Sequence, residues 1–449
     1  MVFWTIFAPI FALIFTWQIF LPFLLRQDAL PLLGVYSQAG KWYWLKFRLM
    51  KFVIERRQKK QSGERNSKKS ENLMKSQFGG DGGERKIEEM EKKHELNTEF
   101  GADAVFFDAA NRDGWYFTLG TAQRPENVIN LFFILKIPSL GTFVNEELLT
   151  DTNVKSLNTS DATWRTASGF TVKCLEPMKK WSLSFQGNLV KSPGFRVFEK
   201  IGAEAEAENF PRIPASFELI WTNFGGQFDF DTACSPTSIA HSLAIEPWSR
   251  ELFERLRASH QTHYEQPKPT HIRSQNAPNS ISSSGFLTGS ITLDSQTFSP
   301  SKMTSMRDHT IASYRRWSDI RRYIMMIYHL EDGTCVHTSV ISMPETVFSQ
   351  LEFGYIVRPS GQVLPVDRVH FSLPNHGESK HDFPAKFHYS FEVADGSKYG
   401  VDVAIRDTVS FKMGLDLSCQ VNENMAEFLV DEKTKGWGFA EVEYRIQPY

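Results

Sequence analysis

The sequence predicts a mainly β protein, with two tandem antiparallel β-barrels or strongly curved sheets behind an N-terminal transmembrane helix. Short apolar or alternating segments recur between turn residues from Gly101 onward, which is typical of barrels and sandwiches. Met1–Leu25 contains no charged residue. A chain of 449 residues is long enough for more than one domain.

The first 25 residues predict a membrane anchor. About 20 apolar residues cross a bilayer, whereas a signal peptide needs a basic start and a small-residue cleavage site, and Met1–Leu25 has neither. Basic residues cluster on its C-terminal side, so we expect a single-pass membrane protein, of an unspecified membrane, with a cytosolic main domain. The glycosylation sequon Asn158-Thr159-Ser160 argues for the opposite orientation.

Residues 26–99 read as a basic juxtamembrane segment and linker. Lys41–Arg57 mixes aromatic and aliphatic residues with bases, so it either lies on an anionic membrane surface or packs on the folded domain. Gln58–Glu95 is rich in Lys, Glu, Ser and Gly, which predicts a solvated linker. The membrane is therefore an expected partner through both the anchor and this segment.

The folded region divides into two β-rich halves, at 100–245 and 286–449. Residues 246–285 connect them, with a helix predicted over Pro247–Tyr264 and a disordered insert over Gln266–Ser284, which is rich in Pro, Asn and Ser. Turn pairs such as Asp332-Gly333 and Asp395-Gly396 are strong hairpin signals. Strands are predicted at 114–120, 128–137, 170–174, 181–185, 217–221, 289–293, 322–330, 336–342, 354–357, 369–373, 386–393, 410–413 and 438–444.

Several motifs in a fixed order resemble a known group of proteins. They read FFDAANRDGWYFTLGTAQR at 106–124, CLEPMKKWSLSFQG at 174–187, HYEQ at 263–266 and MRDHTIASYRRW at 306–317. This order resembles an uncharacterised family that is similar to the N-terminal region of arthropod phosphoenolpyruvate synthase-like proteins. More distantly, it resembles the AttH-like and carotenoid hydratase group, and that resemblance implies a tandem lipocalin-like fold.

The resemblance covers about residues 100–449 and departs from the family pattern at one position. Ala312 stands where the family has a glycine, which puts in doubt any role that needs close backbone approach there. The chain contains no GxxxxGK[ST] phosphate loop, so a phosphotransferase activity is poorly supported.

Arg307, Asp308 and His309 are the candidate catalytic residues. If this stretch is a strand, Arg307 and His309 share one face and Asp308 takes the other. A carboxylic acid in an apolar cavity has a raised pKa and can protonate an alkene, and distant relatives that act on isoprenoids imply such an acid, so we expect Asp308 to be the general acid. The alternative is a buried ion-pair cluster with a structural role.

Five further residues are candidate ligand-binding residues: Arg315, Trp317, Trp181, Asn111 and Arg112. Trp181 alternatively belongs to the core, and the polar cluster around Asn111 alternatively forms a turn network. His329 and His337 flank a hairpin without a third ligand at metal spacing, so no metal site and no cofactor are predicted. The four cysteines are far apart and read as reduced, with two distant disulfides as the alternative.

The net charge of −2 argues against a nucleic-acid partner, and three other functions remain open from the sequence. A small barrel can hold one apolar ligand, which favours binding of an isoprenoid, sterol or acyl lipid. The alternative is a hydratase, isomerase or cyclase that uses the same pocket, and the third is an accessory domain related to phosphoenolpyruvate synthase-like phosphotransferases.

Overall fold

The structure is a computed structural model. It describes residues 27–67, 73–74, 85–86, 91–96, 98–157, 162–192, 210–254, 279–312, 314–346, 348–378 and 383–446. The predicted transmembrane helix at 1–25 and the sequon at 158–160 lie outside these ranges. Within them, no helix is long and apolar enough to cross a membrane.

The first barrel is closed by the pairing of β10 with β11. Its antiparallel strands follow the order β11, β12, β14, β3, β4, β5, β6 and β10. Their bounds are Arg212–Asp229 (β11), Asn279–Leu293 (β12), Met303–Ala312 (β14), Ala102–Ala110 (β3), Tyr116–Arg124 (β4), Val128–Ile137 (β5), Gly141–Asn145 (β6) and Lys180–Lys191 (β10). Shorter strands extend this sheet: Asn153–Lys155 (β7), Thr163–Arg165 (β8), Phe170–Glu176 (β9) and Gln296–Phe298 (β13).

The second barrel is a simple meander in which each strand pairs with the next and the last pairs with the first. Its strands are Arg322–Leu330 (β15), Cys335–Met343 (β16), Phe348–Val357 (β17), Val363–His370 (β18), Lys386–Val393 (β19), Lys398–Met413 (β20), Cys419–Val430 (β21) and Thr434–Arg445 (β22). Gly333 and Gly396 take positive φ in the turns that the Asp-Gly pairs predict. The tandem-barrel prediction is therefore confirmed, and all four cysteines are free.

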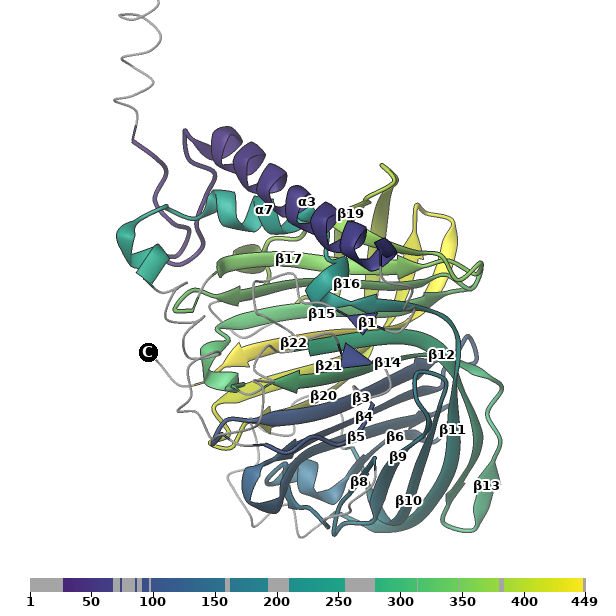
Figure 1. The fold of residues 1–449 in the computed structure, drawn as a ribbon. Helices are drawn as coiled ribbons and strands as arrows, with labels where there is room; N and C mark the ends of the chain where they lie inside the picture. The colour runs from purple at the N-terminus through teal and green to yellow at the C-terminus, as the bar shows by residue number, and fades with distance from the viewer. Residues whose placement is uncertain are drawn as a thin grey trace, which may run out of the picture.

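The barrels pack against each other through the outer faces of their sheets (Figure 1). Phe132 of β5 stacks on Phe411 of β20 with ring centroids 5.1 Å apart, and the hydroxyl of Tyr116 donates to the carbonyl of Ala426 at 3.2 Å. β15 is almost wholly buried, because alternate residues point into the second barrel and toward the first. This contact explains why the strand reads as a continuous apolar run rather than an alternating one.

The boundary between the barrels lies later in the chain than the sequence predicts. The sequence divides the halves at 246–285, whereas β12 and β14 still belong to the first barrel and the second begins at β15. Ser280–Ser284 read as part of a disordered insert, yet they form the start of β12. The hydroxyls of Ser280 and Ser282 donate to Asp308 on the neighbouring strand, so a polar segment could be buried here without an apolar pattern.

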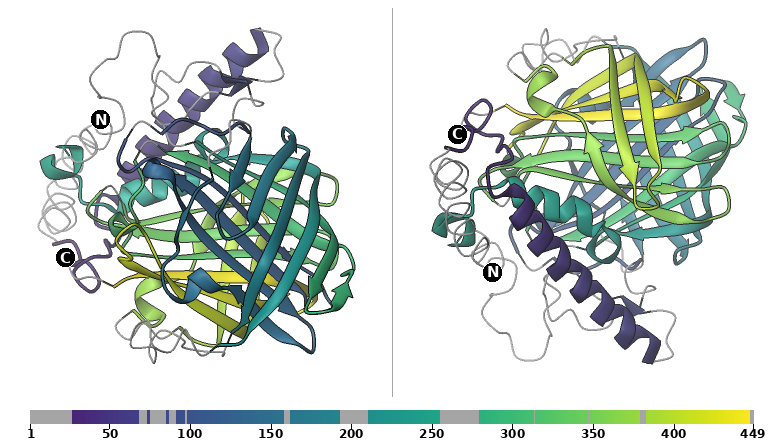
Figure 2. Two further views of the ribbon diagram at one scale, coloured as in Figure 1. Left: turned by 90° about the horizontal axis from the view of Figure 1, so that it is seen from below. Right: turned by 90° about the horizontal axis from the view of Figure 1, so that it is seen from above.

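Helices cover one side of the second barrel (Figure 1, Figure 2). α3 (Tyr43–Ser67) packs on α7 (Pro236–Ile245), which contacts β17 and β18 and follows the short α6 (Phe230–Ala233). Of the helix predicted over Pro247–Tyr264, only 250–254 is described and helical. The remaining elements are β1 (Leu73–Met74), β2 (Arg85–Lys86) and the 3-10 helices η2 (Pro125–Asn127), η3 (Glu146–Leu149), η6 (Trp317–Asp319) and η7 (Leu373–Asn375).

Candidate functional site between and inside the barrels

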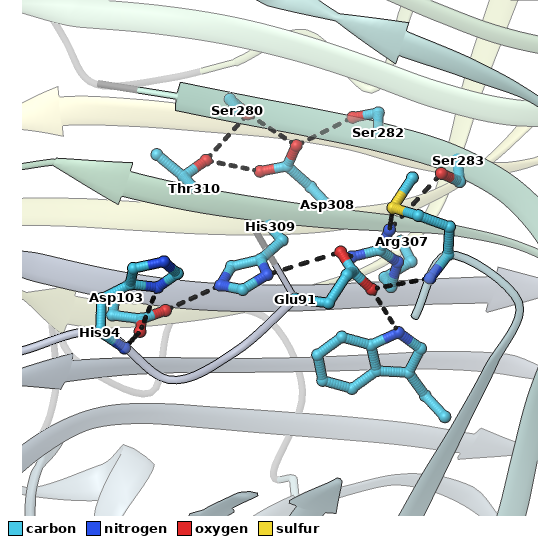
Figure 3. A network of polar contacts seen from close by, with 12 residues as sticks. Glu91, His94, Asp103, Ser280, Ser282, Ser283, Arg307, Asp308, His309 and Thr310 are labelled. Atoms are coloured by element: carbon cyan, nitrogen blue, oxygen red, sulfur yellow. Dashed lines mark hydrogen bonds and ion pairs between the residues drawn. The ribbon is translucent and has the colours of Figure 1, made fainter. Parts of the chain in front are cut away.

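Strand β14 presents its polar residues to two different sites. Arg307 and His309 point into the first barrel, and Asp308 points out of it toward the second barrel (Figure 3). This is the alternation that an extended strand predicts. The three candidate catalytic residues therefore do not form one cluster.

A buried charged network lies inside the first barrel. Arg307 Nη1 lies 2.7 Å from Glu91 Oε1, and His309 Nε2 lies 2.8 Å from Asp103 Oδ1; all four side chains are buried. The backbone N–H of His94 donates to Asp103 at 2.7 Å. Burial raises the pKa of Glu91, but Arg307 and His309 outweigh it and lower this pKa to about 2. Burial lowers the pKa of His309, but Asp103 and Glu91 raise it to about 9, so the network is ionised at neutral pH.

The rest of this barrel is packed with aromatic side chains. Trp181 and Trp221 flank the Arg307 guanidinium at 5.3 and 5.4 Å from their ring centroids. Below them, Phe133 packs on Phe217 at 5.3 Å, within a cluster that also contains Phe117, Phe170 and Phe185. The sequence predicts a ligand inside a barrel, but the interior of this barrel is filled by the protein's own side chains, including Glu91.

Asp308 lies on the outer face of β14, where hydroxyl groups surround it. Ser280, Ser282 and Thr310 donate to its carboxylate at 2.8, 2.9 and 2.8 Å (Figure 3). Burial lowers the pKa of the Arg315 guanidinium, and the charge of Asp308 partly opposes this shift. Trp317 lies beside Arg315, with its ring centroid 5.4 Å from the guanidinium carbon.

Two buried glutamates of the second barrel lie in the contact layer between the barrels, toward which Asp308 also points. Glu423 of β21 and Glu441 of β22 are directly opposite each other in the sheet. Burial raises the pKa of each to about 8, and the charge of Asp108 contributes to the shift of Glu423, whereas Arg315 opposes the shift of Glu441. The hydroxyl of Tyr323 donates to Glu441. Both carboxyl oxygens of Glu423 are buried without a hydrogen-bond partner among the described residues.

An acid–base pair from the two barrels lies beside Glu423. His329 Nε2 of β15 is 3.6 Å from Asp108 Oδ2 of β3, and both side chains are buried. Burial lowers the pKa of His329, but Cys335 and Asp108 raise it to about 10. The layer between the barrels therefore holds carboxyl groups that keep a proton at neutral pH next to groups that can accept one. We call Asp108, Asp308, His329, Glu423 and Glu441 the interbarrel site.

Two predicted ligand-binding residues lie apart from both sites. Asn111 is in the turn between β3 and β4, where its side-chain oxygen accepts from the backbone N–H groups of Asp113 and Trp115 at 3.0 and 3.2 Å. Arg112 is exposed in the same turn and pairs with Asp113 at 3.7 Å. This arrangement matches the turn network that the sequence leaves open as an alternative.

Sequence reasoning missed the residues that complete both sites. Glu91 lies in the stretch read as a solvated linker, where one glutamate among many carries no signal. Glu423 was overlooked because no strand was predicted over β21, and Glu441 lies in the strand predicted at 438–444 but was not singled out. The sequence offered one clue, because Glu441 and Glu443 alternate with apolar residues at strand periodicity.

The network in the first barrel also contains a possible metal-ligand set. Ligand atoms of His94, Asp103 and His309 lie within 4.8 Å of one another. The 2.8 Å contact between His309 and Asp103 is a hydrogen-bond distance, whereas two ligands about 2.1 Å from one ion would be about 3.0–3.4 Å apart. A metal would require these side chains to separate.

Several solved structures are similar to this chain. The AttH protein of Nitrosomonas europaea shares 11% identity at a TM-score of 0.43 and covers 77% of this chain and 93% of its own. Kievitone hydratase of Nectria haematococca shares 10% at a TM-score of 0.39 and covers 78% and 90%. The protein CghA shares 12% at a TM-score of 0.43 and covers 80% and 95%.

These comparisons leave the function of this chain to be inferred from its own residues. No curated protein matches the sequence. The similarity to phosphoenolpyruvate synthase-like proteins that the motifs suggest is not shown by any of these comparisons. A family model does match residues 11–444, so the chain belongs to the family of unknown function DUF8627.

Proposed function

We propose that this protein binds a hydrophobic small molecule between its barrels and transfers a proton to it, as in the hydration, isomerisation or cyclisation of an alkene. The observation that carries this proposal is Glu423, a fully buried carboxyl with no hydrogen-bond partner among the described residues. A buried polar group left unpaired costs stability, commonly about 1–3 kcal/mol. Such groups in native structures are often kept for a functional reason.

Glu423 is a better proton donor than Asp308, to which the sequence-based hypothesis gave this role. The pKa of Glu423, raised by burial and by Asp108 to about 8, keeps the proton on its carboxyl at neutral pH. A donor with a pKa near the working pH is well matched to general acid catalysis. The oxygens of Asp308 already accept hydrogen bonds from three hydroxyls, which suits an acceptor rather than a donor.

The reaction would begin when Glu423 gives its proton to one alkene carbon, and the π electrons form the new C–H bond. The cation that remains adds water and then loses a proton, or it is attacked by an internal double bond to give a ring cation that loses a proton, or it loses a neighbouring proton directly. In each case one proton is released, and the carboxylate of Asp308 or Asp108 accepts it. Returning that proton to Glu423 restores the starting state without a cofactor.

Deuterium uptake from D₂O tests this proposal without knowledge of the substrate. The purified full chain is incubated with a total lipid extract, and mass spectrometry detects deuterium bound to carbon. We expect wild type to label one lipid class and Glu423→Gln to label it about 10²–10⁴-fold more slowly. Glu427→Gln is the matched control, because Glu427 is on the same strand but is exposed and pairs with Arg406.

Each outcome has a defined meaning. Lipids that copurify with the protein but gain no deuterium would show that it binds lipids and does not transfer a proton to them. Equal labelling by wild type and Glu423→Gln would exclude Glu423 as the proton donor.

We also propose that α3 holds this site at an anionic membrane surface. One face of α3 packs on α7, where Tyr43 contacts His241 Nδ1 at 2.7 Å and Lys46 donates to the carbonyl of Glu246. The opposite face exposes large apolar side chains together with arginines: Trp44, Leu45, Leu49, Phe52, Val53, Arg48, Arg56 and Arg57. An exposed apolar stripe with flanking bases is typical of helices that lie in the membrane interface. The two roles predicted for Lys41–Arg57, packing on the folded domain and lying on a membrane surface, would then belong to opposite faces of the helix.

A further inference from the structure

A segment from outside the strands supplies one residue to the charged network of the first barrel. Residues 91–96 precede β3, and the carboxylate of Glu91 reaches into the barrel. It accepts hydrogen bonds from Arg307 Nη1 at 2.7 Å, from Trp181 Nε1 at 3.0 Å and from the backbone N–H of Met178 at 3.3 Å. Three converging donors on two oxygens are a fitted site for a planar carboxylate.

Without Glu91 the strands leave Arg307 in this network without an anionic partner. They contribute the guanidinium of Arg307, the imidazole of His309 and one carboxylate, Asp103. Asp103 is bonded to His309, so the buried guanidinium of Arg307 depends on Glu91 for its anion. A buried charge without a partner is strongly unfavourable. The site therefore requires one negative charge, which matches a monocarboxylate better than a phosphate dianion.

We infer that the place that Glu91 fills inside the first barrel is a binding site for a small organic acid, and that Glu91 occupies it as an internal substitute. The carboxylate of the acid would take the three donors of Glu91. Apolar groups surround this place, since Met178 Sδ is 3.6 Å from Arg307 Nη2 and the rings of Trp181 and Trp221 flank the guanidinium. These walls favour a short aliphatic acid. This site is separate from the interbarrel site and is independent of the proton-transfer proposal.

Chemical rescue of Glu91→Ala tests this inference. The substitution removes the carboxylate and one methylene group, so it opens space for an acid of the size of acetate. We expect the full-chain variant to melt several degrees below wild type in chloride buffer and to regain most of that loss with millimolar acetate, in a saturable manner. Sulfate at equal ionic strength should not restore it. Glu95→Ala is the matched control, because Glu95 is exposed in the same segment.

The experiment tests the site whether Glu91→Ala is folded or unfolded in chloride buffer. If Glu91→Ala is unfolded in chloride, the refolding yield with and without acetate replaces the melting temperature as the readout. Recovery that is specific to carboxylates and to the Glu91 variant supports the site. A lack of recovery with formate, acetate, propionate and butyrate, or an equal response of Glu95→Ala, would overturn it.

Discussion

Glu423 should give the protein an unusual dependence of stability on pH. Its pKa is about 8 in the folded state, raised by burial and Asp108, and about 4.3 in an unfolded chain. The folded state therefore binds a proton that the unfolded state has released, so this group makes the protein less stable as pH rises from about 5 to 8. Above pH 8 the carboxyl also ionises in the folded state, and the loss levels off.

Denaturant titrations at pH 5, 7 and 9 measure this effect. Between pH 5 and 9, wild type should lose on the order of a few kcal/mol more than Glu423→Gln, which cannot ionise. Glu441 makes the same kind of contribution in both proteins, so some pH dependence remains. Parallel curves for wild type and Glu423→Gln would contradict the raised pKa, and Glu427→Gln should follow wild type.

Single residues also show where sequence reasoning reached its limit. Strand alternation correctly separates Arg307 and His309 from Asp308, because it depends only on local backbone geometry. The identity of the partners could not be predicted in the same way. Glu91 and Asp103 reach β14 from positions more than 200 residues away in the chain.

At the scale of elements, the exposed face of α3 predicts binding to anionic vesicles. A chain beginning at Gln27, where the described structure starts, should float with vesicles that contain anionic lipid. The triple variant Leu45→Ser, Leu49→Ser, Phe52→Ser should bind at least tenfold more weakly, because it removes several kcal/mol of apolar burial at about 25 cal/mol per Å².

Three exposed residues of the same types provide the control for this experiment. Leu175, Phe253 and Leu415 are 43%, 55% and 47% exposed and lie outside α3. Their combined replacement by Ser should leave vesicle binding unchanged. Equal loss in both triple variants would show that general hydrophobicity, rather than the face of α3, determines binding.

Three strands were predicted with both ends correct. Arg322–Leu330 and Lys386–Val393 match β15 and β19, where Asp-Gly turns follow apolar runs, and 128–137 matches β5, which Pro138 follows. β12 was partly read as disordered, since its serines are buried against polar groups on distant strands. Composition alone cannot distinguish such a strand from a solvated loop.

At the scale of the whole molecule, the two barrels should unfold as one cooperative unit. The apolar cluster between them contains residues of both barrels, including Ile134, Val144, Phe411 and Phe439. Phe411→Ala removes the stacking on Phe132 and a fully buried ring. We expect a loss of about 3–5 kcal/mol in a single calorimetric transition that still includes both barrels. Two separated transitions, with only one of them shifted, would show that the barrels fold independently.

The sequence by itself determined that the chain forms two antiparallel β-barrels, because turns and alternation are local properties that repeat along the strands. It also separated the two faces of β14. Only the tertiary structure decided which strands complete each barrel, that Glu91 enters the first barrel, and that Glu423 and Glu441 meet Asp108 between the barrels. These contacts join residues far apart in the chain, and the pKa shifts arise from burial and from neighbouring charges, which exist only once the barrels have packed together.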